Sequence, residues 1–315
     1  IWIDTVRGDD KQLESDITDA QVTRASAAYR FLKDGFAVST VGNMNNPVNY
    51  IAWCWKAGGS SNTYNIDGTG YGTASAAGLD GGTITPTGAS INTEAGFAIL
   101  TYTGTNSVSE TIAHGLGKKP AWILIKSRSA SSKNWVVYHH ANTDNPSNVY
   151  LELSGTDANA DETEIFNDTE PTSSLITIGD DGKVNQSSVT YVMYVWTEIP
   201  GYSKFGSYTG NGNSNGTYVH LGFRPAFILT KRSDGTTPWR LFDNKRPNAN
   251  FQTYKLEADS SGAELTGYAY ADFLSNGFKI RDSGSYQNAS GGTYIYFAFA
   301  EQPGTTAFDT FPNPR

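Results

Sequence analysis

The four histidines and the recurring glutamates are the residues of this chain whose types and spacing could do chemistry. His114 and His220 lie at equivalent places in two copies of one turn, and a catalytic residue rarely repeats together with its whole surroundings. We therefore interpret both as turn-capping or packing residues, with ligand contact as the alternative. His139 and His140 follow an apolar run, and neighbours on a strand point to opposite faces, so they make a poor joint metal site.

Glutamates recur beside landmarks of the sequence. Glu152 and Glu257 each follow a leucine, and Glu198 and Glu301 follow apolar runs, whereas the first such run ends in Lys56. Hydrolysis of a glycoside requires two carboxyl groups about 5 to 9.5 Å apart. Because the pattern is not preserved in the first copy, we interpret these glutamates as solvated strand ends.

Searches for other catalytic or metal-binding patterns give little. The acidic loops at 157–164 and 180–182 offer oxygen ligands, but neither fits the twelve-residue calcium loop, so calcium is kept only as an alternative. The sequence holds no Gly-x-Ser-x-Gly elbow, P-loop, His-Glu-x-x-His motif or Cys/His zinc spacing. We therefore predict a binding or structural protein without a cofactor, and not an enzyme.

Composition limits the remaining classes. The 315 residues carry a formal net charge of -8, with 17% charged residues and no run of Lys or Arg typical of a nucleic-acid binder. No apolar stretch reaches the roughly 18 residues of a membrane helix, so membrane insertion is not expected. Cys54, the only cysteine, lies in an apolar run and is interpreted as a buried small hydrophobe.

The elements that would position these residues are repeated three times. Each copy ends in a Tyr-led apolar strand, at 50–55, 191–196 and 294–299, preceded by a Leu-Glu pair and a tryptophan, which are Trp2, Trp135 and Trp239. Two copies also share a front half, at 101–122 and 207–227. The first copy lacks a front half, so we expect an upstream segment or a neighbouring chain to supply the absent strands.

This repetition predicts the fold class. Abundant glycine and aromatic residues suit short strands joined by turns, and we predict an all-β fold of tandem β-sandwich units, lectin- or jelly-roll-like, with long loops. A helix is considered only at 15–32. The Tyr-led strands are apolar on both faces, so both faces must be covered. The predicted divisions are a partial unit at 1–57, a Gly/Ser/Thr-rich linker at 58–95, complete units at 96–200 and 201–304, and a tail at 305–315.

Segments 201–210, 222–229 and 288–296 resemble the repeated-unit, tail-fibre-like virion proteins of marine tailed bacteriophages. The resemblance extends over most of residues 1–304. It implies a particle component with lectin-like β-sandwich units, located in the virion after assembly in the host cytoplasm. It transfers no catalytic or sugar-contact residue.

The expected function is adhesion to host surface glycans, because aromatic faces stack on sugars and turn amides bind hydroxyls. Expected partners are further copies of the chain, a trimer included, and other virion proteins. One alternative is a capsid decoration or fibre-shaft protein without a ligand, and another is a polysaccharide depolymerase. Core packing is the alternative for the tryptophans among the candidate glycan contacts, which are Trp135, Tyr138, Trp239, Asn244 and Arg246.

Overall fold

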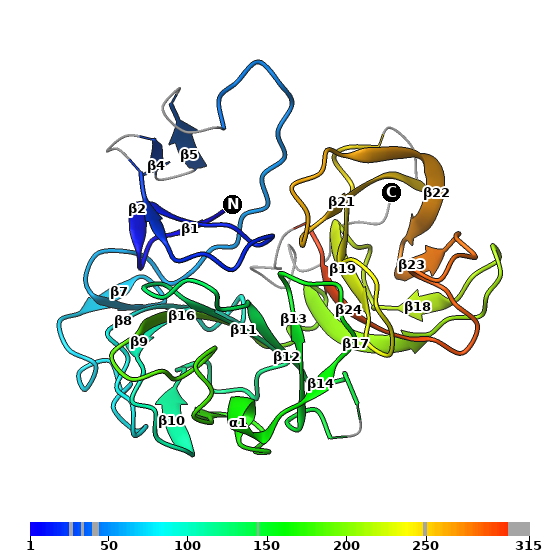
Figure 1. The fold of residues 1–315 in the computed structure, drawn as a ribbon. Helices are drawn as coiled ribbons and strands as arrows, with labels where there is room; N and C mark the ends of the chain where they lie inside the picture. Colours follow the sequence, from blue (N-terminus) through cyan, green and yellow to red (C-terminus); the bar gives the residue numbers. More distant parts are fainter. Residues whose placement is uncertain (25–27, 33–34, 40–43, 144, 248–250, 302–315) are drawn as a thin grey trace.

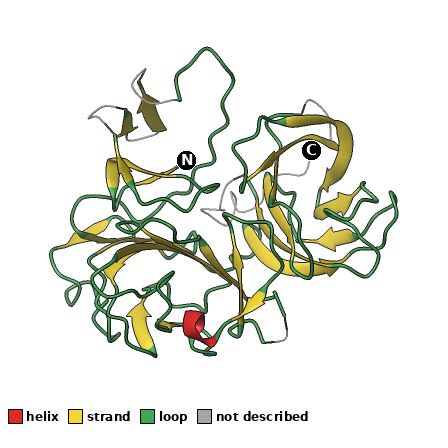
Figure 2. Cartoon of the chain, in the orientation of Figure 1, coloured by secondary structure: helices red, strands yellow, loops and turns green. Residues whose placement is uncertain are grey.

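The computed structural model describes residues 1–24, 28–32, 35–39, 44–143, 145–247 and 251–301. Strands dominate the described chain, and its helical content is the single turn α1 (Thr163–Phe166), so the all-β prediction is confirmed (Figure 2). The described residues of 15–32 contain no helix but hold the strands β3 (Val22–Thr23) and β4 (Tyr29–Leu32), so that helix candidate is wrong. The predicted tail at 305–315 lies outside the described residues.

Residues 96–200, here called unit 2, form a sandwich. Its strands are β9 (Phe97–Thr103), β10 (Glu110–Ala113), β11 (Trp122–Ser127), β12 (Val136–His139), β13 (Val149–Glu152), β14 (Ala160–Asp161), β15 (Leu175–Ile178) and β16 (Thr190–Trp196). One layer has the strand order β14-β13-β12-β11-β16-β9, and the other is the antiparallel pair of β10 and β15. Apolar side chains from both layers fill the space between them, including Ile112, Ile123 and Ile176.

Residues 201–301, here called unit 3, repeat this arrangement on the opposite side of the molecule (Figure 1). The strands are β17 (Ser203–Thr209), β18 (Tyr218–His220), β19 (Phe227–Arg232), β20 (Arg240–Asp243), β21 (Phe251–Glu257), β22 (Leu265–Leu274), β23 (Gly277–Ile280) and β24 (Thr293–Phe299). The sheet order is β17-β24-β19-β20-β21-β22-β23-β18. The long strand β22 joins two layers that remain separate in unit 2.

The two units share their strand pairing. In each, the Tyr-led strand pairs antiparallel with the first strand of its unit on one side and the third on the other. Asn185 and Asn288 recur ahead of these strands, and each donates through Nδ2 to main-chain oxygens that hold the adjoining loops together. The sequence repeat therefore corresponds to a repeated topology.

Residues 58–95 are folded into unit 2, and the prediction of a linker is wrong. The strands β6 (Tyr64–Ile66), β7 (Thr69–Tyr71) and β8 (Gly88–Asn92) extend its larger layer to nine strands beyond β9. A few widely spaced apolar residues anchor the segment, since Leu79 and Ile91 are fully buried. Gly58 allows a close approach as well, because a Cβ there would lie 2.0 Å from the Ile91 carbonyl oxygen. The Gly/Ser-rich composition concealed these anchors.

The first 57 residues, here called unit 1, contain the back half of the same topology. Its strands are β1 (Trp2–Asp4), β2 (Gly8–Leu13), β3, β4 and β5 (Gly35–Val38). Trp2 lies opposite Leu13, as Val137 lies opposite Leu151 in unit 2. Trp2 is therefore the counterpart of Val137, and its predicted equivalence to Trp135 and Trp239 is wrong by two positions.

Residues 50–55 form no strand in the structure, although the sequence predicted one. In units 2 and 3 the corresponding strand pairs on both sides with strands of the front half. Unit 1 has no front half, so this segment runs extended without a ladder. Ile51, Trp53 and Trp55 are half-buried while Ala52 and Cys54 are exposed, so Cys54 is not the buried residue that was expected.

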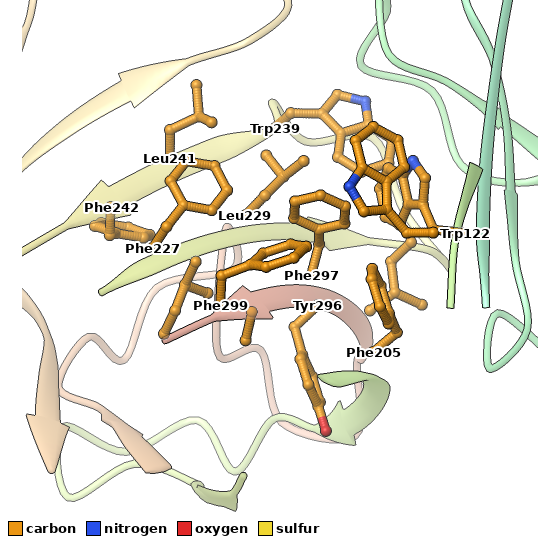
Figure 3. Close-up of a cluster of buried hydrophobic side chains, with 14 of the residues drawn as sticks. Trp122, Phe205, Phe227, Leu229, Trp239, Leu241, Phe242, Tyr296, Phe297 and Phe299 are labelled. Carbon is orange, nitrogen blue, oxygen red and sulfur yellow. The ribbon is translucent and has the colours of Figure 1, made fainter. Parts of the chain in front are cut away.

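One aromatic core, here called the shared core, lies where the three units meet. Figure 3 shows the part of it in which Trp122 of unit 2 lies beside side chains of unit 3. Trp55 of unit 1 lies 6.1 Å from Trp196 of unit 2 and 6.0 Å from Phe297 of unit 3, and the latter two rings are 5.2 Å apart between centroids. In unit 2 the other face of β16, with Met193, points into the unit's own interior. The expectation that the Tyr-led strands are covered on both faces is confirmed for β16 and β24, which are buried along residues 191–196 and 294–299.

Candidate functional site

Three of the five predicted glycan contacts lie in the protein core. Trp135, Tyr138 and Trp239 are each 0% exposed. The Tyr138 hydroxyl donates to Glu170 Oε2 at 2.8 Å, and burial raises the pKa of this phenol well above its usual range. None of the three rings can stack on a surface sugar in this fold, so their prediction as ligand contacts is corrected to core packing.

The two tryptophans join neighbouring units. Trp135 Nε1 of unit 2 donates to the Glu14 carbonyl oxygen of unit 1 at 2.8 Å, and Trp239 Nε1 of unit 3 donates to the Glu152 carbonyl oxygen of unit 2, also at 2.8 Å. Glu14 and Glu152 belong to the repeated Leu-Glu pairs, so the same hydrogen bond occurs between units 1 and 2 and between units 2 and 3. The tryptophans repeat because the contact between units repeats.

Arg246 also has a structural role. Its guanidinium contacts Asp243 Oδ2 at 2.6 Å and Glu264 Oε1 at 2.9 Å, and it lies 5.8 Å from the Trp53 ring of unit 1. Its side chain is only 10% exposed, so the prediction of a free ligand contact is wrong. Asn244 is half-buried and donates its main-chain N–H to the Ala226 carbonyl oxygen. The glycan contact predicted for its side chain remains a prediction.

The histidines serve turns and unit contacts. His114 is buried beside the Thr172 carbonyl and accepts a hydrogen bond from the main-chain N–H of Leu116, and burial lowers the pKa of His114 to about 4. The Nε2 atoms of His139 and His140 both lie 3.1 Å from carbonyl oxygens of unit 3. Both rings face unit 3. They need not point to opposite faces, because β12 ends at His139 and His140 lies beyond the strand. Burial lowers the pKa of His139 to about 3.

The acidic loops show paired carboxylates. Glu162 and Asp181 both approach Lys183 Nζ, at 3.1 and 3.9 Å. Among the described residues no group of three or more His, Cys, Asp or Glu side chains is placed to hold a metal ion. Calcium at these loops remains only an alternative to the prediction of no cofactor.

A cluster that the sequence did not reveal lies in the interior of unit 3, and it is here called the Arg240 site. The Arg240 side chain, 5% exposed, projects from β20 toward the loop that follows β23. Its Nη1 atom donates to Gln287 Oε1 at 3.0 Å and lies 3.5 Å from Asp282 Oδ2, while Nε lies 4.0 Å from Glu257 Oε1. Burial lowers the pKa of Arg240, although it remains a permanent cation.

Two aromatic rings lie close to this cation. The guanidinium carbon of Arg240 lies 4.5 Å from the centroid of Tyr286 and 5.6 Å from that of Tyr270. Lys255, which pairs with Glu257, lies 5.8 Å from the Tyr270 ring. Tyr270 is buried whereas Tyr286 is 48% exposed, so the site grades from the interior of the unit to its surface.

Several polar atoms of the Arg240 site have no protein partner. Arg240 Nε, Gln287 Nε2 and Thr230 Oγ1 are buried without a hydrogen bond, and Thr230 is the strand neighbour of Arg240. Leaving a buried donor or acceptor unpaired costs about 1–3 kcal/mol. The hydrogen-bonding capacity of these atoms is therefore not satisfied by the described residues.

Unit 2 fills the equivalent positions with apolar side chains. The equivalence follows from the register, because the Tyr102 hydroxyl donates to the carbonyl at position 184 as the Tyr208 hydroxyl donates to that at 287. The unit 2 residues are fully buried in its apolar interior, with Val136 for Arg240, Ile125 for Thr230 and Val184 for Gln287. The repeated fold thus forms without these polar groups, and their presence in unit 3 is specific to that unit.

A planar cation between two tyrosines, with two carboxylates and an amide beside it, suits a ligand rich in hydroxyl groups. Aromatic rings pack against the apolar face of a sugar, while guanidinium, carboxylate and amide groups bind its hydroxyls. The signal in the sequence was the departure from the repeat at positions 230, 240 and 287. The earlier interpretation concentrated on residues that recur.

In the described part of the chain no helix is long and apolar enough to cross a membrane. No curated protein matches the sequence, and no solved structure matches it. One family model, described as a domain of unknown function (DUF7483), matches residues 1–303. Because the match covers nearly the whole repeat array, the chain belongs to the DUF7483 family.

Proposed function

We propose that this protein is a tail-fibre-like virion component that attaches the particle to host surface glycans through the Arg240 site of unit 3. The virion assignment rests on the resemblance of the repeated segments to tail-fibre-like proteins. The glycan assignment rests on one observation, which is the buried cation of Arg240 between Tyr270 and Tyr286 with unpaired polar atoms around it.

Electrostatics supports a hydroxyl-rich ligand over a strongly charged one. Glu257 and Asp282 lie beside Arg240, and Lys255 pairs with Glu257, so the charges of the site largely offset one another. A neutral or singly acidic sugar can exchange its hydrogen bonds with water for those of the site, and the exposed face of Tyr286 offers a stacking platform.

The test is binding of the full chain to an array of bacterial surface glycans, followed by titration with the best hit. We expect Tyr286→Ala to weaken binding about tenfold, the loss of roughly 1.4 kcal/mol that one stacked ring contributes. Tyr218→Ala is the matched control, because Tyr218 is 42% exposed on β18 of the same unit but outside the Arg240 site. Equal losses for the two variants would reject the Arg240 site.

The same glycan hit separates a binder from a depolymerase. Incubation with the intact polysaccharide should leave its chain length unchanged if the site only binds. Shortened chains that disappear in Glu257→Gln would instead assign hydrolysis to the carboxylates beside Arg240.

A structural role without a ligand is the second candidate, and the shared core favours it. Three units packed on one aromatic core make a rigid body suited to a fibre shaft or a capsid surface. This alternative would be supported by firm incorporation into particles together with no hit on the array.

A further inference from the structure

We propose that a surface formed by residues 50–55 of unit 1 and the edge 256–265 of unit 3 is a docking site for a further front half of this repeat, supplied from outside these 315 residues. The inference is independent of the glycan proposal. It rests on two complete contacts between units and on a third that is only partly made.

Both complete contacts between units contain a buried lysine. Lys126 Nζ of unit 2 donates to the Thr18 carbonyl oxygen of unit 1 at 2.9 Å, and Lys231 Nζ of unit 3 donates to the Thr156 carbonyl oxygen of unit 2 at 3.1 Å. Both lysines are 0% exposed. Each front half therefore places one ammonium group on the edge of the preceding unit, four residues beyond the glutamate whose carbonyl binds the indole of the tryptophan.

The main chain repeats the same contact. Gln21 donates its N–H to the Arg128 carbonyl oxygen, and Asn159 donates its N–H to the Ser233 carbonyl oxygen, both at 2.8 Å. Lys133 and Thr237 likewise donate their N–H groups to the Thr18 and Thr156 carbonyl oxygens. Together with the lysine and the indole, four hydrogen bonds recur between units 1 and 2 and between units 2 and 3. A front half thus recognises a defined edge, and not merely an apolar surface.

Unit 3 carries a third copy of this edge with no front half on it. The counterparts of Glu152 and Thr156 are Glu257 and Ser261, and within the described residues neither carbonyl accepts a hydrogen bond from another unit. Residues 260–269 are all exposed. Two large side chains stand in this exposed stretch, Leu265 at 50% and Tyr268 at 73%.

Residues 50–55 form the other wall of the proposed site. The face that carries Ala52 and Cys54 is exposed, whereas the corresponding face of β16, with Met193 and Val195, is fully buried in the interior of unit 2. Trp53 Nε1 is buried without a hydrogen-bond partner. Residues 51–55 have the composition and the extended course of a central strand, but none of the described strands pairs with them.

Unit 3 and unit 1 already approach each other as the other pairs of units do. Arg246 of unit 3 lies over Trp53 of unit 1, just as Arg7 of unit 1 contacts the Tyr194 hydroxyl of unit 2 at 3.1 Å. Each arginine is held by an aspartate three residues before it. The front half missing from unit 1 would therefore lie between residues 50–55 and the free edge of unit 3.

The occupant must be an additional front half, because both front halves of this chain are already paired within their own units. In unit 2 the front half pairs with β16 on both sides, and in unit 3 it pairs with β24 on both sides. A second copy would have to unfold one of its own units to donate either. Its chemistry is accordingly an apolar strand pair followed by a lysine and a tryptophan.

The test joins a copy of residues 202–239 directly to Ile1 of the full chain. Asp4 and Arg7 match Asp243 and Arg246, so the copied Trp239 would directly precede Ile1 in register. The readout is alkylation of Cys54, the only thiol. We expect labelling to slow by about tenfold or more, since the counterparts of Cys54 are fully buried strand residues that react only on opening.

Two controls sharpen this experiment. A copy with the same residues in scrambled order should leave Cys54 labelling unchanged, and equal labelling of the true and scrambled fusions would overturn the proposal. A copy with Lys231→Met and Trp239→Phe keeps the apolar packing but loses both donors, so it should protect Cys54 less. If the copy with Lys231→Met and Trp239→Phe protected Cys54 fully, the edge of unit 3 would not be part of the docking site.

The last measurement uses the chain without a fused copy. We expect the molar mass of the unextended chain in solution to stay the same on dilution, and Cys54 to react at every concentration. An oligomer in which Cys54 is already protected would show that a second copy covers the surface, contrary to the proposal.

Discussion

Units 2 and 3 have the same strand pairing but very different interiors. Unit 2 encloses aliphatic and aromatic side chains, with Ile125, Val136 and Val184 fully buried. Unit 3 places Thr230, Arg240 and Gln287 at the same positions. Since unit 2 shows that the fold needs no polar group there, the polar groups of unit 3 are a departure from the repeat that packing does not require. Repetition inside one chain thus separates what packing requires from what function adds.

The strongest way to break this comparison is to put the cation of unit 3 into unit 2. Val136→Arg would bury a guanidinium among aliphatic residues. Glu152 lies opposite Val136 but already accepts a hydrogen bond from Asn134, so we expect a loss of about 3–5 kcal/mol in the free energy of unfolding. Urea titration of the purified chain measures the loss. Ser214→Arg, in an exposed loop, should change stability by less than about 0.5 kcal/mol. Similar values for the two variants would contradict the account of the interior of unit 2.

Unit 2 should lose stability in acid because of a histidine that units 1 and 3 do not have at the same position. His139 stands where units 1 and 3 have Asp4 and Asp243, and burial lowers the pKa of His139 from 6.5 to about 3. Between these values the unfolded chain binds a proton that the folded chain does not, so stability falls as the pH drops below 6.5. The expected loss from this group is about 3 kcal/mol at pH 4.

The measurement is the free energy of unfolding between pH 7 and pH 4. His114 contributes a loss of the same sign because burial lowers its pKa to about 4, so some acid sensitivity should remain when His139 is replaced. His139→Gln should reduce the slope. An unchanged slope in that variant would place the acid-sensitive group elsewhere.

Converting unit 3 to the interior of unit 2 should cost little. The combination of Thr230→Ile, Arg240→Val and Gln287→Val removes the buried cation and its amide partner. The carboxylates of Glu257 and Asp282 remain, but their side chains are 20% and 27% exposed and Glu257 keeps Lys255 as a partner. Replacing buried ionic groups by apolar ones is often neutral or stabilising by about 1–4 kcal/mol. Thermal and urea unfolding of this variant should equal or exceed those of the parent. A variant that fails to fold would show that the Arg240 site is needed for the structure itself.

The smallest effect is expected at the mouth of the Arg240 site. Tyr286→Ala removes one ring from above Arg240, and an exposed cation–π contact contributes about 0.5–1 kcal/mol. Urea unfolding should detect a loss of that size. A loss several times larger would mean that Tyr286 supports the fold, which would weaken its use as a binding probe.

The strongest strands could be predicted because their residues carry the signal locally. β11, β16, β19 and β24 are runs of β-branched and aromatic residues, and both faces of β16 are buried as their composition requires. The same local reasoning failed at residues 50–55. An apolar run becomes a strand only when other strands lie beside it, and those are absent from unit 1.

The candidate site was not predicted, for a related reason. Trp135 and Trp239 were chosen because they recur and could stack on sugars, yet they recur because each donates to the preceding unit. Arg240 follows Trp239 directly, but nothing about a single arginine indicates burial between two tyrosines. Its position in the interior depends on the register of β20 against β21, which follows from long-range pairing.

The same tryptophan hydrogen bond joins unit 1 to unit 2 and unit 2 to unit 3, and an arginine of unit 3 approaches Trp53 of unit 1 as an arginine of unit 1 approaches unit 2. Head-to-tail contacts either close or continue without limit, and closure fixes how many members can take part. Closure through the contact of unit 3 with unit 1 would therefore limit the array to three units. Duplicating or deleting a whole unit should be far more damaging than lengthening a loop, so relatives are expected to differ in loop size while keeping the number of units constant.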